Sequence, residues 1–183
     1  MDFQIGKLLD SMTAEEKENT VIIFIGDNGT PNEVAQSPYL STTVKGTLYQ
    51  GGINVPMFIS GKGVLRTGID ENLITSTDLF STIAQIAGVS TSEIHDSKSF
   101  KSLLSQSETI RNFQYCEKDD GTNNLWTISN GGYKLFKNAN GNDEFYDLNN
   151  DPYEQNNLLN GTLTTTENTI KTELETELSN IRN

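Results

Sequence analysis

The sequence predicts an α/β fold: the C-terminal part of a mixed or parallel sheet flanked by helices, followed by a small α+β domain with a four-stranded antiparallel sheet and a C-terminal helix. Two apolar runs, residues 20–26 and 55–61, have the β-branched and aromatic content of buried strands. Segments with helical periodicity lie before and after them. Beyond about residue 92 the segments become short and turn-rich. We therefore expect two domains, residues 1–92 and 93–183.

The first expected elements are a helix and a buried strand. The helix follows from apolar residues spaced three and four apart, at Ile5, Leu8, Leu9 and Met12. A capping-box pattern at residues 13–16 comes next. Residues 20–26 lack polar alternation, which favours a strand covered on both faces in the interior of a parallel sheet.

An irregular loop, a second strand and a second helix are expected to follow. Residues 30–43 have no periodicity and contain two prolines, which is typical of a loop. Residues 55–61 then form the second apolar run. In the helix, Thr75 is placed to cap the start and Gly88 to end it, and one face carries Leu79, Phe80, Ile83, Ile86 and Ala87.

The second domain is expected to be an antiparallel meander closed by one helix. Turn residues such as Asn130-Gly131-Gly132 separate four strand candidates, which span residues 112–116, 125–129, 133–137 and 144–148. Thr164 and Glu167 fit a capping box at the start of the final helix. Its apolar face consists of Ile170, Leu174, Leu178 and Ile181.

The composition excludes several classes of function. The 183 residues include 13 Lys and Arg against 25 Asp and Glu, a net charge of −12, so we expect no nucleic-acid partner and no membrane surface. One cysteine and one histidine exclude a disulfide framework, a cysteine-based zinc cluster and a histidine-rich metal site. We expect no membrane span and no signal peptide in this chain.

Asp27 and Asn28 are candidate metal ligands. They follow a buried strand directly, where α/β sheets place their ligands. A carboxylate beside an amide oxygen offers hard donors, which suit Ca²⁺ or Mg²⁺ rather than zinc. The alternative is that Asn28-Gly29 is simply a turn, because this dipeptide is common in turns.

Lys45 is a candidate anion ligand at the start of a glycine-rich segment. The three glycines of residues 45–52 let the backbone approach a ligand closely, and the ammonium group can hold an anion. The alternative is a surface lysine before a loop, since the segment lacks the spacing of a nucleotide P-loop.

Taken together, the ordered segments resemble the second half of a sulfatase of the alkaline phosphatase superfamily. The resemblance covers nearly the whole chain, and it is carried by Phe24-Ile25-Gly26-Asp27-Asn28-Gly29, Lys45-Gly46-Thr47-Leu48-Tyr49-Gln50-Gly51-Gly52-Ile53-Asn54-Val55-Pro56, residues 77–88, residues 132–135 and residues 145–158.

This resemblance implies roles for the candidate residues. Asp27 and Asn28 would be the two late ligands of a divalent metal, usually Ca²⁺. Lys45 would be a catalytic residue that contacts the sulfate oxygens and offsets charge on the leaving oxygen. The family's nucleophile is a formylglycine made from Cys or Ser within C/S-x-P-x-R. Cys116 has neither Pro at +2 nor Arg at +4, so it is not that nucleophile.

The formylglycine and the remaining site residues are therefore expected in a missing upstream part, and this chain alone is expected to be inactive. The resemblance implies a metal-dependent sulfuric ester hydrolase, acting on a sulfated small molecule or glycan, with the missing N-terminal half of the same enzyme as partner. It also implies a periplasmic or secreted location for the intact enzyme. The alternatives are a phosphodiesterase or phosphonate hydrolase of the same superfamily, or a non-catalytic truncated binding module.

The other reactive side chains receive structural interpretations. His95 is expected to be a surface or linker residue rather than a general acid, and Cys116 a buried or half-buried thiol. Glu173, Glu175 and Glu177 spread around the last helix and form a solvated face. The glycosylation triplets at Asn28 and Asn160 carry no weight. Tyr39, Tyr49 and Gln50 are expected near the mouth of the site, whereas Gln50 and Asn54 depart from the residues frequent in the family.

Overall fold

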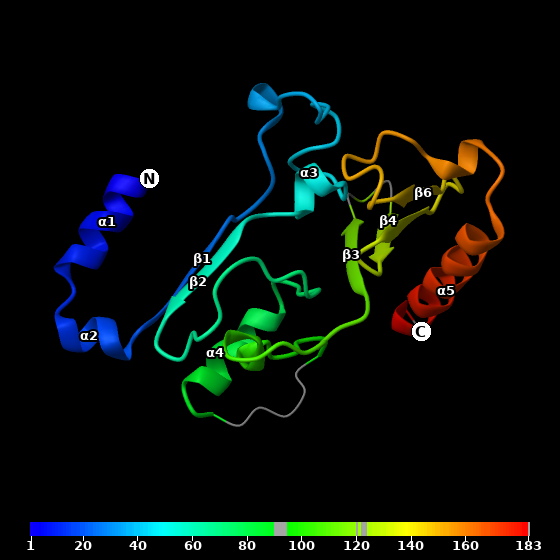
Figure 1. Ribbon diagram of the computed structural model, residues 1–183. Helices are drawn as coiled ribbons and strands as arrows, with labels where there is room; N and C mark the ends of the chain where they lie inside the picture. Colours follow the sequence, from blue (N-terminus) through cyan, green and yellow to red (C-terminus); the bar gives the residue numbers. More distant parts are fainter. Residues whose placement is uncertain (90–94, 120, 122–123, 183) are drawn as a thin grey trace. The chain divides into compact units, whose positions relative to one another are not determined.

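The computed structural model describes residues 1–89, 95–119, 121 and 124–182 (Figure 1). Its residues group into two compact units that alternate along the chain. Unit 1 consists of Met1–Gly26, Pro56–Glu71 and Ser76–Glu108, and unit 2 of Asp27–Val55, Asn72–Thr75 and Thr109–Asn183. Each unit is described by itself below.

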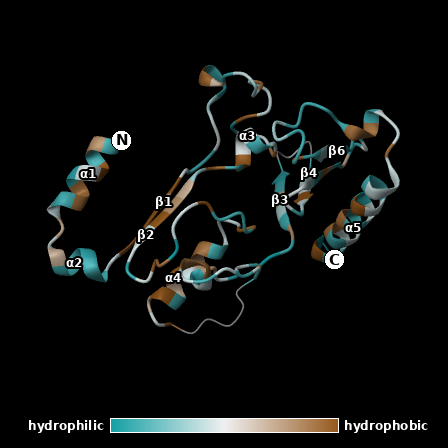
Figure 2. Ribbon diagram, in the orientation of Figure 1, coloured by the Kyte–Doolittle hydropathy of each residue, from teal (hydrophilic) through white to brown (hydrophobic). Residues whose placement is uncertain are grey.

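Unit 1 begins with two helices and contains one pair of strands. Helix α1 (Asp2–Ser11) is confirmed, and α2 (Ala14–Asn19) carries a complete capping box between Thr13 and Glu16. Strands β1 (Val21–Ile25) and β2 (Met57–Gly61) pair antiparallel, with Ile23 opposite Ile59. Figure 2 shows the hydrophobic character of both strands.

The expected parallel neighbour of β1 is absent among the described residues, where β1 pairs only with β2. The unbroken apolar run of residues 20–26 indicates that both faces of the strand are apolar. It does not indicate whether the neighbouring strand is parallel or antiparallel. All five residues of β1 are partly exposed in this chain.

Helix α4 (Asp78–Ile86) buries its polar side within unit 1. Its cap is Thr77 and not Thr75, so the predicted start was wrong. The helix begins where the Asp78 carboxylate accepts a hydrogen bond from the Lys98 amide, an interaction across 20 residues that local sequence does not reveal. Gly88 follows the helix with φ 79°, as expected for a C-terminal glycine. Phe80 and Ile83 on the apolar side are 55% and 54% exposed.

The segment after α4 completes unit 1. Residues 100–104, expected to be helix-like, form the short 3₁₀ helix η2 (Lys101–Leu104). The carbonyl of Leu104 accepts hydrogen bonds from the amides of Leu65 and Arg66, which follow β2. A long-range backbone contact therefore ties η2 to the end of the strand pair.

Unit 2 contains the predicted antiparallel meander. Its four strands form a sheet in the order β3-β4-β5-β6, with all neighbours antiparallel. They span β3 (Gln114–Asp119), β4 (Asn124–Ser129), β5 (Tyr133–Asn138) and β6 (Glu144–Asp147). Ile128 lies opposite Leu135, and Leu135 lies opposite Phe145.

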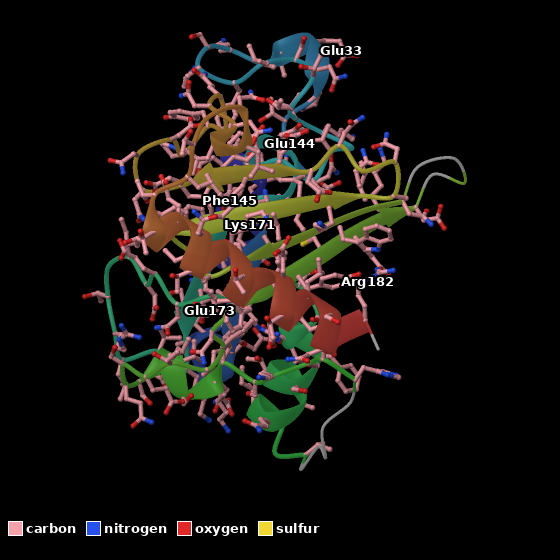
Figure 3. All side chains as sticks on the ribbon, turned by 90° about the vertical axis from the view of Figure 1, so that its right-hand side faces the viewer. Glu33, Glu144, Phe145, Lys171, Glu173 and Arg182 are labelled. Carbon is pink, nitrogen blue, oxygen red and sulfur yellow. The ribbon has the colours of Figure 1, made fainter. Side chains whose placement is uncertain are left out.

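Helix α5 (Thr165–Arg182) covers one face of this sheet. Thr164 and Glu167 exchange the hydrogen bonds of the predicted capping box. Leu174 and Leu178 pack with Ile128, Leu135 and Phe145 in one buried cluster. Figure 3 shows α5 running along the sheet, with Lys171 and Glu173 on the helix.

The opposite face of the sheet packs against a segment from the first third of the chain. Side chains alternate between the two faces of a strand, so Phe136 and Tyr146 point away from the α5 cluster. They bury Leu48, just before the short helix α3 (Gln50–Ile53). Two 3₁₀ turns, η1 (Asn32–Val34) and η3 (Leu158–Asn160), lie in the connections of unit 2. None of the helices in the described ranges is both long and apolar enough to span a membrane.

Candidate functional site

The three candidate residues all belong to unit 2, and all three side chains are exposed. Asp27 and Asn28 lie in the turn that follows β1 in the chain. Lys45 lies in the loop between Val44, which is fully buried, and Gly46. A buried valine next to an exposed lysine fixes the backbone while leaving the ammonium group free to reach solvent.

Backbone contacts hold the turn and the loop side by side. The Lys45 amide donates to the Thr30 carbonyl at 2.9 Å, and the Thr30 amide donates to the Gly51 carbonyl at 3.3 Å. Gly29 lies so close to α3 that a Cβ atom there would be 2.1 Å from the Gly51 carbonyl oxygen. The segment that carries Asp27 and the segment that carries Lys45 therefore form one local structure.

Gly52 in α3 likewise packs too closely on neighbouring backbone to allow a side chain. A Cβ atom on Gly52 would lie 2.3 Å from the Thr47 carbonyl oxygen and 2.8 Å from the Val44 carbonyl oxygen. The Thr47 hydroxyl donates to the same Val44 carbonyl at 2.7 Å. The glycines thus permit close packing of backbone on backbone.

Three side chains from the sheet of unit 2, and one from the segment after β6, bind consecutive parts of residues 45–50, the lysine loop. Lys118 donates to the Gly46 carbonyl at 2.7 Å, and Lys134 donates to the Leu48 carbonyl at 2.6 Å. The Tyr49 hydroxyl donates to Glu144, labelled in Figure 3, at 2.7 Å. The Gln50 amide, at the start of α3, donates to Glu154 at 2.5 Å.

Lys134 and Glu154 form a buried ion pair at the centre of these contacts. Their charged atoms are 2.7 Å apart, and the two side chains are 2% and 1% exposed. Burial lowers the pKa of Lys134, and the neighbouring Glu154 carboxylate opposes that shift. Burial likewise raises the pKa of Glu154, against the effect of Lys134. Each partner thus stabilises the charged form of the other.

Asp27 and Asn28 fit part of a metal shell. Their side-chain oxygens are the donors that Ca²⁺ prefers, but Ca²⁺ takes six to eight oxygen ligands in all. Across residues 1–89, 95–119, 121 and 124–182, no three His, Cys, Asp or Glu side chains come together as a metal site. Asp27 and Asn28 by themselves would supply only two of the six to eight oxygen ligands of such an ion.

The other candidates have structural surroundings of their own. His95 is exposed in unit 1, with φ 52°. Its neighbours Glu93 and Ile94 lie outside the described residues. Cys116 is half-buried in β3, where burial raises the pKa of its thiol. Tyr49 points to Glu144 rather than into solvent.

The remaining acidic and aromatic candidates have structural partners. Glu173 is exposed, and Glu175 accepts a hydrogen bond from Lys171 at 2.6 Å on the same helix. Tyr39 packs edge-on against Tyr153, with ring centroids 4.9 Å apart. Tyr39 also lies beside Gly51, since its ring carbon would be 3.0 Å from a Cβ atom there.

Sequence reasoning missed Lys118, Lys134, Glu144 and Glu154 as functional candidates. The sequence did contain an indication for Lys134, because it precedes two apolar residues within a predicted strand. A lysine on the buried face of a strand requires a partner for its charge. Nothing in the local sequence around Glu154 identifies its partner, 20 residues away.

The comparisons with known proteins point to one family. The family model "Sulfatase" matches residues 1–89. An arylsulfatase from Hemicentrotus pulcherrimus is 30% identical over 139 residues, covering 71% of this chain and 24% of the relative. The chain spans between 24% and 34% of the length of the curated relatives it matches.

Solved structures show the same fold at lower identity. BT4656, in complex with its substrate D-glucosamine-2-N,6-O-disulfate, matches with a TM-score of 0.79 at 21% identity, over 98% of this chain and 37% of that chain. A phosphonate monoester hydrolase of Agrobacterium radiobacter matches with a TM-score of 0.75 at 20% identity, over 99% of this chain and 38% of that chain. The fold is that of the alkaline phosphatase superfamily. Within it, the chain belongs to the sulfatase family.

Proposed function

We propose that this chain is the C-terminal portion of a sulfuric ester hydrolase and completes that enzyme's metal and sulfate site. One observation carries the proposal: the turn with Asp27 and Asn28 is bonded through Thr30 to the loop with Lys45, in a chain of the sulfatase family. Two oxygen donors and one ammonium group thus share one local structure. This is the chemistry that a sulfate ester requires.

Each residue has a distinct role in this proposal. The Asp27 carboxylate and the Asn28 amide oxygen hold a divalent cation, Ca²⁺ by its oxygen preference. Such a cation acts as a Lewis acid toward the oxygens of the transferred group. Lys45 binds the sulfate oxygens and offsets negative charge as it grows on the leaving oxygen. Its exposed ammonium group is free to reach a ligand.

The nucleophile belongs to the upstream part of the enzyme in this proposal. That part supplies the formylglycine and the remaining metal ligands, and it covers exposed apolar surface of unit 1, to which Phe58 and Phe80 each contribute. Isolated, this chain has no turnover and self-associates through that surface. We further propose the division into domains at residues 1–92 and 93–183, and a periplasmic or secreted location for the whole enzyme.

The substrate class is a sulfated small molecule or glycan. The similar structure of BT4656 holds a sulfated glucosamine as its substrate, which supports this class. A second candidate, a phosphonate hydrolase or phosphodiesterase, is favoured by the similarity to the phosphonate monoester hydrolase. A non-catalytic binding module is the third reading, because Cys116 lacks the surroundings of the family nucleophile.

The test uses the complete gene product, obtained by reading the coding DNA upstream of Met1 in frame. Hydrolysis of an aryl sulfate is compared with hydrolysis of the matching aryl phosphonate monoester, for the wild type and for Lys45→Ala. The proposal expects preference for the sulfate and a loss of turnover in the variant. Preference for the phosphonate supports the second candidate, and the absence of any C/S-x-P-x-R segment together with no turnover supports the binding module.

A further inference from the structure

The lysine loop is held in place by the sheet of unit 2 through a continuous series of hydrogen bonds. A backbone group of every second residue, at Gly46, Leu48 and Gln50, has a side-chain partner on the sheet or on the loop after it. Within the described part of the chain, the exposed Lys45 has no such partner for its own side chain, so its position depends on its neighbours. The loop is therefore held by these side chains in addition to its backbone bond with Thr30.

We propose that the buried Lys134–Glu154 pair is a positioning device for Lys45, an inference that rests on the proposed function. Lys134 lies in β5 on the face that packs against Leu48, and its Nζ bonds both the Leu48 carbonyl at 2.6 Å and the Glu154 carboxylate at 2.7 Å. The other Glu154 oxygen accepts from the Gln50 amide at 2.5 Å. The two charged side chains thus bind the loop at Leu48 and at Gln50, two residues apart.

The backbone at Glu154 supports a role beyond packing. Glu154 has φ 56°, in the left-handed region that non-glycine residues rarely adopt. Such conformations persist only where surrounding contacts over-determine them, and they concentrate at functional positions. Here the Asp151 carboxylate accepts from the Gln155 and Asn156 amides at 3.0 and 2.7 Å. The turn is therefore built to hold Glu154 in this unfavourable conformation.

Buried ion pairs are seldom needed for the stability of a core. Replacing a buried ion pair by uncharged residues of similar size is often without cost to stability, whereas removing one partner is strongly destabilising. The charged pair beneath the lysine loop thus serves to fix the position of the loop. Misplacement of a catalytic group by about 1 Å lowers turnover by roughly 100-fold.

The experiment compares Lys134→Met, Glu154→Gln and the double variant Lys134→Met/Glu154→Gln in the complete enzyme. Lys171→Met is the matched control, because it removes a lysine from an ion pair with Glu175 on α5 that does not touch the loop. The single variants lower the melting temperature, and the double variant regains most of that loss. In the double variant kcat for an aryl sulfate stays about 100-fold low, while KM changes by less than about threefold.

A second readout is independent of turnover. The Lys45 amide donates to Thr30 in the intact structure, so in the double variant its hydrogen exchange accelerates by at least about 10-fold while that of the α5 amides is unchanged. If kcat recovers together with the melting temperature, or the Lys45 amide stays protected, the pair is a structural element only and the proposal is overturned. A wild-type enzyme that turns over no sulfate ester contradicts the proposed function instead, and the exchange measurement still decides on the positioning.

Discussion

Substitution of Gly29 by alanine tests whether the turn that carries Asp27 and Asn28 forms one structure with the lysine loop. A Cβ atom at this position meets three backbone atoms, at 2.1 Å from the Gly51 carbonyl oxygen and at 2.6 and 2.7 Å from Gly52. Because these are backbone atoms, the turn has to retreat by about 1 Å, at a cost of roughly 1–3 kcal/mol for overpacking. For a chain of this size, about 2 kcal/mol lowers the melting temperature by about 4–8 °C.

The assay is thermal unfolding followed by circular dichroism, together with hydrogen exchange at the Thr30 amide, which bonds Gly51. The matched control is Gly161→Ala in the same unit, where the nearest atom to a new Cβ is 3.8 Å away and φ is −124°. Gly29→Ala loses stability and protection at Thr30, whereas the control changes little. A Gly29→Ala protein with wild-type melting and wild-type protection at Thr30 would show that the turn and the loop do not pack as one structure.

Three further perturbations have defined outcomes. Burial and the hydrogen bond to Glu117 raise the pKa of Tyr115 to about 12 from 10.0, so the unfolded chain releases this proton first, and the free energy of unfolding falls as the pH rises from 10 to 12. In urea titrations over this pH range, the free energy of unfolding of Tyr115→Phe falls less steeply than that of the wild type. An equal fall in both proteins counts against this role of Tyr115. Leu174→Ala, at a position with no exposed surface, lowers the free energy of unfolding by about 2–5 kcal/mol. Leu8→Ala, at a position that is 66% exposed, lowers it by less than about 0.5 kcal/mol. Equal urea midpoints for the two variants would contradict the assigned core. Burial raises the pKa of the Cys116 thiol, so a disulfide reagent at pH 8 modifies it at least about 10-fold more slowly in the native chain than in urea, and equal rates would show an accessible thiolate.

Elements that depend on residues a few positions apart in the chain were predictable from the sequence. Both capping boxes, the meander and the amphipathic α5 follow from residue patterns a few positions long, and the structure confirms each. The match between Asp27, Asn28 and Lys45 and the segments of a known family also needed only the linear sequence. The terminal pattern of residues 145–158 was visible in the same way.

The features that escaped prediction depend on contacts between distant residues. The start of α4 depends on a hydrogen bond between Asp78 and Lys98. The direction of β2 relative to β1 depends on a pairing across more than 30 residues. Lys134 and Glu154 reach Leu48 and Gln50 across 86 and 104 residues. No periodicity or short motif records such pairings, because each partner is ordinary in its own neighbourhood.

The most direct test of the central claim measures bound calcium and sulfate-ester turnover on the same preparations of the complete enzyme. Three proteins are compared: the wild type, Asp27→Ala and Lys45→Ala. Removal of the Asp27 carboxylate takes an anionic ligand from the cation, so that variant loses both calcium and turnover. Lys45→Ala keeps its calcium and loses turnover, because only the contact to the sulfate oxygens is removed. An Asp27→Ala enzyme with wild-type calcium content and wild-type turnover would contradict the account.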